Sequence, residues 1–494
     1  MSYTPTSVLR RQLIYLTATA AVTILYILTT APSVYTNDSA EFTLGVYTQG
    51  IVHSTGYPTY LLLGRVFTWL PLHPEFAVRV NLFSAVAGVV TFYCLLRLCE
   101  AVVGYDPLLT AGVCGVFVFA PEIWAHAVVA EVYLLHTALV SAILLLTFAG
   151  ELSVGRLYVI ALLFGVSFGN HLAAVLVAAV VYPYLWWQAP TWRVRWTMVA
   201  MTTVVTVTLY LYLPVRFAAD PALNILEPHF DRDLRNPANL LWLVSGGMFD
   251  ERMFGYGPVA YLRELVAFVP QLGRNLTLPG VLVGLVGVWD LARRFTGGAV
   301  VVGGAFTLQV IFFAGYNVFD KWTMFHTAYL MWTVFMVAGV FRLMALVPRQ
   351  WLVGVLAVIC VYQVAAHWQS AGRFRDTGVR DQSLAILEAL PPDALLVGSW
   401  LSVRPVDYFQ QVHGLRPDVT LYDFTLVGLS MRDALPDETE GAWQAATLAA
   451  TAATIDCYPG DVFIVEGFFI EDDYALEPFI PGLFRVTKQS LDCR

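Results

Sequence analysis

Charged residues are scarce in this chain of 494 residues, because Asp, Glu, Lys and Arg together make up only 13% of it. In soluble proteins about a quarter of the residues are charged. The scarcity excludes an ordinary water-soluble protein, and the absence of a basic patch argues against a nucleic-acid partner. Cysteine is also rare, and four of the six cysteines fall inside apolar runs, as expected for small buried residues.

Hydrophobic residues, in contrast, make up 58% of the chain. Apolar runs long enough to cross a hydrocarbon core of about 30 Å recur from Leu13 to Trp368. They predict a polytopic α-helical membrane protein whose membrane domain covers residues 1–370. We expect about eleven transmembrane spans, at residues 12–30, 79–103, 107–122, 128–149, 156–169, 171–188, 196–214, 278–294, 298–316, 324–345 and 350–368.

Arginines favour one orientation of these spans in a cell or inner membrane. The run after Arg11 is as long as a full span and Pro32 spoils the cleavage site, so we expect an uncleaved first helix. With the N-terminus in the cytoplasm, the alternate short connections carry the arginines, as the positive-inside rule requires. The extracytoplasmic side then receives the loops 31–78 and 216–277, the turn at 122–127 and the tail.

The tail, residues 371–494, alternates apolar and helix-like pieces, which predicts a small extracytoplasmic α/β domain. It contains no glycine-rich phosphate loop and no obvious catalytic set. Cys457 and Cys493 both lie in it, and whether they pair stays open.

Two carboxylates, Asp38 and Glu41, directly follow the first span and would share one face of a helical turn. Taken alone, they are explained as well by helix capping. The predicted topology, however, brings other polar residues to the same side of the membrane, where titratable groups at span ends are functional by default. These residues are His53, Tyr57, Arg79, Glu122, His126, Glu131, Arg216, Asp320 and Lys321.

Glu131 is the most telling of these residues, because a glutamate just inside a span needs a partner such as His53, Arg79 or His126. Snorkelling to the interface explains Glu131 equally well. His136 and His171, near the same ends of their spans, are more often satisfied core histidines than ligands.

Acids and bases beside an amphipathic segment at residues 45–70 suit group transfer from a lipid-linked phosphate donor. A carboxylate would deprotonate the acceptor hydroxyl, while Arg, Lys, His or a divalent metal such as Mg²⁺ or Mn²⁺ would stabilise the departing phosphate. The competing hypotheses are a transporter or flippase of a lipid-linked precursor without transferase activity, and a catalytically silent scaffold.

Several ordered motifs resemble the plexin-type protein O-mannosyltransferase family of the GT-C superfamily, long catalogued as a membrane domain of unknown function. They run in the family's order over about the first 330 residues. The motifs are Asp38-Ser-Ala-Glu-Phe42, Gly50-Ile-Val-His-Ser-Thr-Gly-Tyr-Pro58, Arg79-Val-Asn-Leu-Phe-Ser-Ala85, Ala130-Glu-Val-Tyr133, Gly169-Asn-His-Leu172, Tyr212-Leu-Pro-Val-Arg216 and Tyr316-Asn-Val-Phe-Asp320.

The resemblance implies a GT-C bundle, a polyprenyl-phosphate-linked sugar as donor and an inverting transfer. Asp38 would be the base and Glu41 its helper, Glu131 would occupy the second-loop acidic position, and Arg216 would lie near the donor phosphate. The other expected substrate-binding or donor-binding residues are His53, Tyr57, Arg79, His126, His171, Asp320 and Lys321.

The chain departs from the family pattern in two places. Ser54 and Thr55 stand where the family usually has two prolines, which affects the expected local turn but not the acids. The repeats that some members carry after the membrane part are missing, which weakens any transfer of the acceptor's identity. Mannose and Ser or Thr of a protein are therefore what the family implies, with a glycan as the other acceptor class. Membrane lipid is an expected partner, and the motif spacing does not settle whether a metal is needed.

Overall fold

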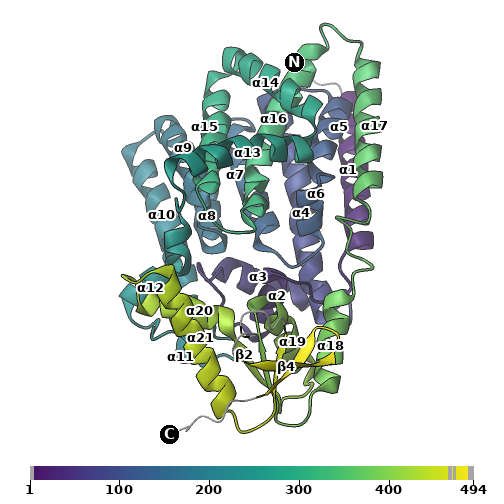
Figure 1. Cartoon of the computed structure of the whole chain (residues 1–494). Coiled ribbons are helices and arrows are strands. Elements are labelled where there is room, and N and C mark those ends of the chain that lie inside the picture. Colours follow the sequence, from purple (N-terminus) through teal and green to yellow (C-terminus); the bar gives the residue numbers. More distant parts are fainter. Residues whose placement is uncertain (1–4, 466–469, 471–473, 488–494) are drawn as a thin grey trace.

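The computed structural model describes residues 5–465, 470 and 474–487. A bundle of long helices forms one end of the molecule, and a sheet with its covering helices forms the other (Figure 1). Between them lie the two short helices that follow the first long helix, α2 (Asp38–Thr48) and α3 (Pro58–Thr68). The chain therefore places the predicted acidic loop at the junction of its two parts.

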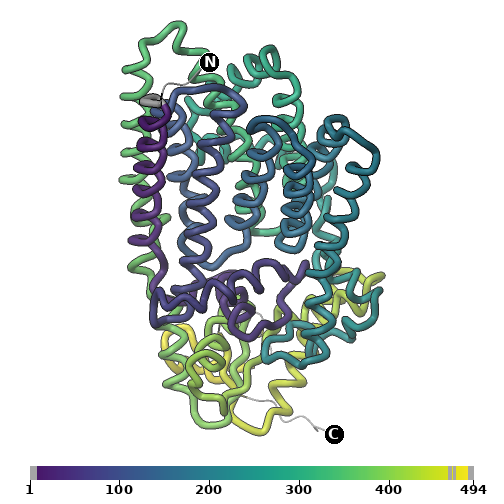
Figure 2. Tube along the Cα trace, turned by 180° about the vertical axis from the view of Figure 1, so that it is seen from behind, coloured from purple at the N-terminus to yellow at the C-terminus, as the bar shows by residue number. Residues whose placement is uncertain are grey.

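The bundle contains the helices expected from the apolar runs. Its elements are α1 (Pro5–Thr29), α4 (Phe76–Val102), α5 (Pro107–Val118), α6 (Pro121–Ala127), α7 (Val132–Phe148), α8 (Val154–Asn170), α9 (Ala174–Gln188), α10 (Trp192–Tyr210), α11 (Tyr212–Ala218), α14 (Leu278–Arg294), α15 (Thr296–Ala314), α16 (His326–Leu343) and α17 (Arg349–His367). The helix nearest the N-terminus and α17 run side by side along one edge (Figure 2).

Six helices in the described part of the chain are long and apolar enough to cross a membrane, or eight if each of two bent pairs forms one span. Each of the eleven predicted spans coincides with a helix, but α7, α8 and α9 have only 15 to 17 residues. A full crossing needs about 20 residues. The integral membrane class follows from the long apolar helices, while the count of eleven spans stays a prediction.

Close helix packing in the bundle depends on glycine. A Cβ atom at Gly287 of α14 would lie 1.7 Å from the carbonyl oxygen of Phe335 in α16, and one at Gly339 would lie 2.0 Å from that of Val283. The two helices therefore pack backbone against backbone, as small residues allow in membrane bundles. This contact holds α16 at the centre of the bundle, where most of its residues are buried.

The long segment 216–277 is more helical than the sequence predicts. It contains α12 (Pro237–Val244), the short 3₁₀-helix η1 (Gly247–Arg252) and α13 (Pro258–Leu276). α13 has 19 residues and meets α14 at an angle of 107°, after a break at Thr277. The sequence suggests short amphipathic pieces here, mixed with Pro221, Pro228 and Pro237. α13 nevertheless runs on without a break through its own proline, Pro270.

The C-terminal part is an α/β arrangement, as the alternating pattern predicts. Its strands are β1 (Leu395–Gly398), β2 (Thr420–Asp423), β3 (Val462–Val465), β4 (Ala475–Ile480) and β5 (Leu483–Thr487), in the sheet order β2-β1-β3-β5-β4. β1 runs parallel to β2 and β3, whereas β5 runs antiparallel to β3 and β4. The helices are α18 (Gly378–Ala389), α19 (Trp400–His413), α20 (Phe424–Ala434) and α21 (Glu440–Cys457).

α19 joins the two parts of the molecule. Its buried residues Trp400, Tyr408 and Phe409 belong to the same hydrophobic cluster as the bundle, while the opposite face of the sheet has a cluster of its own. The Tyr408 hydroxyl donates to the Glu75 carboxylate and accepts from the backbone N–H of Ala77 at 3.1 Å, at the start of α4. Cys457 is disulfide-bonded, and Cys493 lies outside the described residues.

Candidate functional site

The acidic loop is organised around one ion pair. Both oxygens of the fully buried Glu41 carboxylate accept hydrogen bonds from His53, one from the backbone N–H at 2.8 Å and one from Nδ1 at 2.6 Å. The other ring nitrogen, Nε2, faces an Asp38 oxygen at 3.7 Å. Asp38 keeps 27% of its side chain exposed and is therefore the open end of this triad.

Helix capping does not explain these carboxylates. α2 begins at Asp38 after Asn37, which has φ of 56° and makes no side-chain cap bond. Glu41 uses its oxygens on His53 rather than on the first turn of its own helix.

Local chain geometry brings His53 back onto α2. The segment after α2 runs along residues 223–225, where Ile51 N–H donates to the Leu223 carbonyl at 2.8 Å. Gly50 fits there because a Cβ atom would lie 2.4 Å from that same carbonyl oxygen. Gly56 then turns the chain with φ of 81° into α3. Glycines thus set the distance between Glu41 and His53.

Burial and the neighbouring charges shift the pKa values of His53 and Asp38. Desolvation alone would lower the pKa of His53, but the carboxylates of Glu41 and Asp38 outweigh it and raise the pKa to about 9. Burial raises the pKa of Asp38, with the His53 charge opposing the shift and Glu41 adding to it. An imidazolium therefore lies between two carboxylates at neutral pH.

Asp320, in the loop after α15, faces the same space. Burial, and then the charge of Asp38, raises the pKa of Asp320 to about 6, while His53 and His126 act against the shift. The structure thus brings together residues that are far apart in the sequence, as the predicted topology requires.

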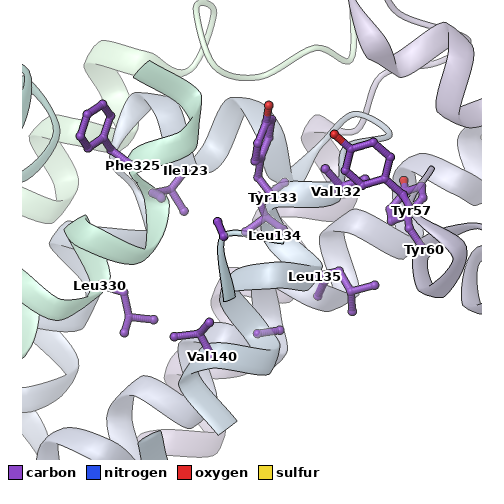
Figure 3. Packing of buried hydrophobic residues seen from close by; sticks show 14 of the residues in the cluster. Tyr57, Tyr60, Ile123, Val132, Tyr133, Leu134, Leu135, Val140, Phe325 and Leu330 are labelled. Atoms are coloured by element: carbon purple, nitrogen blue, oxygen red, sulfur yellow. The ribbon is translucent and has the colours of Figure 1, made fainter. Parts of the chain in front are cut away.

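Aromatic and imidazole rings continue the site toward the bundle. The Tyr57 ring centroid lies 5.1 Å from that of His53 and 5.9 Å from that of His171. The Tyr133 ring centroid lies 5.7 Å from that of His171 and 6.0 Å from that of His126. Tyr57 and Tyr133 direct their hydroxyl groups to the same side of the packed core (Figure 3).

Glu131 precedes α7 and is buried, but it pairs with none of its expected partners. Its backbone N–H donates to the Ser84 hydroxyl oxygen at 3.1 Å, while its Oε2 has no hydrogen-bond partner among the described residues. A buried carboxylate oxygen without a donor is unfavourable, so this position is suited to a ligand or water that donates to it.

Three basic residues named from the sequence contact groups other than Asp38, Glu41 and His53. Arg216 donates to the carbonyls of Gln49 at 2.6 Å and Thr48 at 3.1 Å, at the end of α2. Lys321 pairs with Glu264 at 2.7 Å. Arg79 donates to the Thr68 carbonyl at 2.7 Å.

Sequence reasoning missed the contributions of α19 and α16. The Trp400 ring centroid lies 5.6 Å from that of His53, and the His326 ring lies 5.0 Å from that of His126. Arg404, one turn after Trp400, is buried between Asp407 at 3.1 Å and Asp423 at 3.2 Å. In the sequence, only the short spacing between Arg404 and Asp407 indicates an ion pair in the tail. Nothing in the sequence connects this ion pair to His53.

One group of side chains could hold a cation. Ligand atoms of Asp38, Glu41 and His53 all lie within 4.8 Å of one another. Two carboxylates and an imidazole are a donor set for Mn²⁺ or Zn²⁺ more than for Mg²⁺, which prefers oxygen alone.

Solved structures share the fold of this chain. The crystal structure of ArnT from Cupriavidus metallidurans bound to undecaprenyl phosphate superposes with a TM-score of 0.64, at 12% identity, over 96% of this chain and 97% of that one. The oligosaccharyltransferase AglB from Archaeoglobus fulgidus, in complex with an inhibitory peptide and a dolichol-phosphate, superposes with a TM-score of 0.52 at 12% identity. The match covers 97% of this chain and 74% of that one. The fold is that of the GT-C membrane glycosyltransferases.

Sequence comparison then points to one family. Residues 38–193 match the family described as the protein O-mannosyl-transferase TMEM260 N-terminal domain. Mouse (Mus musculus) protein O-mannosyl-transferase TMEM260 is 33% identical over 132 residues, which is 26% of this chain and only 18% of that protein. The resemblance inferred from the ordered motifs is confirmed, and the matched segment begins at Asp38.

Proposed function

We propose that this protein is a membrane glycosyltransferase that moves a sugar from a polyprenyl-phosphate donor to a hydroxyl acceptor. The observation that carries the proposal is the partly exposed Asp38 carboxylate beside the buried His53–Glu41 pair, within a GT-C fold. The similar proteins support it, since one is named a protein O-mannosyl-transferase and the two solved structures contain undecaprenyl phosphate and a dolichol-phosphate.

In this mechanism Asp38 is the base. It takes the proton of the acceptor hydroxyl while that oxygen forms a bond to the anomeric carbon of the sugar. The bond from that carbon to the phosphate oxygen breaks, polyprenyl phosphate leaves, and the configuration at the carbon is inverted. Burial raises the pKa of Asp38, which makes the carboxylate a stronger base.

Glu41 and His53 hold the geometry of the base. The two hydrogen bonds from His53 fix Glu41, and the imidazolium at 3.7 Å orients the Asp38 carboxylate. A divalent ion held by Asp38, Glu41 and the neutral form of His53 would take the place of the imidazolium proton and would supply positive charge for the departing phosphate. Asp320, Tyr57, His126, Glu131 and His171 form the surroundings in which the sugar is bound.

We propose eleven spans with the site on the extracytoplasmic face, where residues 371–494 form a domain. Support comes from the coincidence of every predicted span with a helix, and from the arginine pattern. Mannose and Ser or Thr of a protein are the proposed sugar and acceptor, from the family match alone.

The decisive assay uses the purified full-length protein in lipid nanodiscs with radiolabelled polyprenyl-phosphate sugars and a set of peptide and glycan acceptors. The proposal predicts a labelled acceptor whose new linkage has the configuration opposite to that of the donor. Movement of the donor across the bilayer of a vesicle without any labelled product would support a flippase and refute the proposal.

A further inference from the structure

The C-terminal part of the chain touches the proposed catalytic residues directly. α19 packs against α2, the helix that carries Asp38 and Glu41. Its first residue, Trp400, sets its ring against the His53 imidazole at 5.6 Å, with the two planes at 68°. Trp400 is held there by its backbone N–H, which donates to the Thr425 hydroxyl at 3.1 Å. α19 therefore covers the His53 side of the site.

Two N–H groups on this turn of α19 lack an acceptor. Trp400 is 8% exposed and Arg404 is 9% exposed, yet the indole Nε1–H of the first and the Nε–H of the second have no partner among the described residues. The guanidinium carbon of Arg404 lies 5.6 Å from the centre of the Trp400 ring, so the two groups are neighbours. Buried donors without acceptors are rare in folded proteins.

The charges around these donors determine what they can bind. Arg404 is already paired with the carboxylates of Asp407 and Asp423. Glu41 and Asp38 lie on the facing helix, so carboxylates outnumber the guanidinium and imidazolium charges here. A phosphate would meet net negative charge, whereas a neutral carbonyl oxygen accepts hydrogen bonds without that penalty. An indole N–H and a guanidinium N–H can only donate, and a carbonyl oxygen can only accept.

We propose that Trp400 and Arg404 form the acceptor side of the site, where their free N–H groups bind a main-chain carbonyl of a polypeptide acceptor. This inference rests on the proposed function and narrows its acceptor to an extended peptide. The carbonyl next to the acceptor Ser or Thr would bind at α19, which places the hydroxyl beside Asp38. Both donors are sealed from solvent, so the peptide enters by displacing the first turn of α19 from α2.

The test measures kinetics of the full-length protein in nanodiscs with a polyprenyl-phosphate sugar and a synthetic Ser- and Thr-containing peptide. Trp400→Phe keeps an aromatic ring against His53 and removes the N–H. It should raise KM for the peptide about tenfold, the effect of one lost hydrogen bond, and leave kcat and KM for the donor unchanged. Arg404→Lys keeps the positive charge, loses Nε–H, and should act in the same direction.

Trp443→Phe is the matched control. Trp443 lies in α21 and its indole N–H already donates to the Leu435 carbonyl at 2.9 Å, so its loss should leave peptide KM unchanged. A peptide whose amide beside the acceptor residue is replaced by a trans-alkene should bind the wild-type protein more weakly. Trp400→Phe should weaken the binding of that analogue no further.

Three results would overturn the inference while the transferase function stands. These are an unchanged peptide KM in both variants, a raised KM for the donor instead, or transfer to glycan acceptors with none to peptides. Absence of transfer from the wild-type protein to any acceptor would refute the proposed function itself, and the inference with it.

Discussion

His53 binds Glu41 through two atoms at once, its backbone N–H at 2.8 Å and its ring Nδ1 at 2.6 Å. The double contact ties a loop residue to a buried carboxylate on α2 and leaves Nε2 turned toward Asp38. The stability, pH response and chemistry of the site all depend on this pair.

Removal of the Glu41 charge should change how stability depends on pH. The pKa of His53 rises from 6.5 to about 9 on folding, so the pair stabilises fully below pH 6.5 and the contribution is lost as pH rises through 9. The shift corresponds to roughly 3 kcal/mol. Thermal unfolding with a chelator present should show a Tm that falls over this range, and less so in Glu41→Gln. An identical fall in both proteins would refute the role of the pair.

Asp320 should destabilise the fold at neutral pH, whereas the His53–Glu41 pair stabilises it. Its pKa of about 6 in the folded protein exceeds the ordinary 3.8, so ionisation of Asp320 lowers the stability of the fold. This loss of stability is absent below pH 3.8 and complete above pH 6. Asp320→Asn should therefore gain stability on the order of 2 kcal/mol at pH 7 and none near pH 3.5. Denaturant unfolding at both pH values measures this. The exposed Asp437→Asn is the control, and an equal gain in the control would contradict the account.

Substitution of Arg216 shows whether this residue stabilises the end of α2 or binds the donor phosphate. Its hydrogen bonds to the carbonyls of Thr48 and Gln49 predict that Arg216→Ala loses about 2 kcal/mol of stability, with KM for the donor unchanged. Arg235→Ala, which removes an exposed ion pair with Asp233, should change neither quantity. A raised donor KM at unchanged stability would instead place Arg216 at the phosphate.

Metal binding can be measured without turnover. Mn²⁺ should raise the Tm of the wild-type protein and not that of Glu41→Gln, because the cation would need both carboxylates and the imidazole. The rise should be larger at pH 8.5 than at pH 6.5, since a proton on His53 competes with the metal. An equal rise in both proteins would show that the cation binds elsewhere.

The sequence predicted most of the helices and the acidic loop, because long apolar runs and paired carboxylates are local signals. His53, Tyr57, His126 and Asp320 do gather near Asp38, as the one-sided topology required. The position of Arg216 near the donor phosphate stays a prediction. Its hydrogen bonds to the end of α2 could not be predicted, because the sequence does not position the backbone carbonyls that accept them. Trp400 was missed because its contact with His53 joins segments almost 350 residues apart, and Arg404 was missed because it reaches the site only as a neighbour of Trp400.

The loss of Asp38 tests the central claim most directly. Asp38→Asn removes the base but only a 3.7 Å contact to His53, so the protein should fold normally. General-base catalysis contributes roughly 10²- to 10⁴-fold, and transfer from the polyprenyl-phosphate sugar should fall by about that factor, with donor binding retained. The assay compares initial rates of the wild-type protein, Asp38→Asn and Asp437→Asn at equal folded concentration. A fully active Asp38→Asn protein would contradict the account.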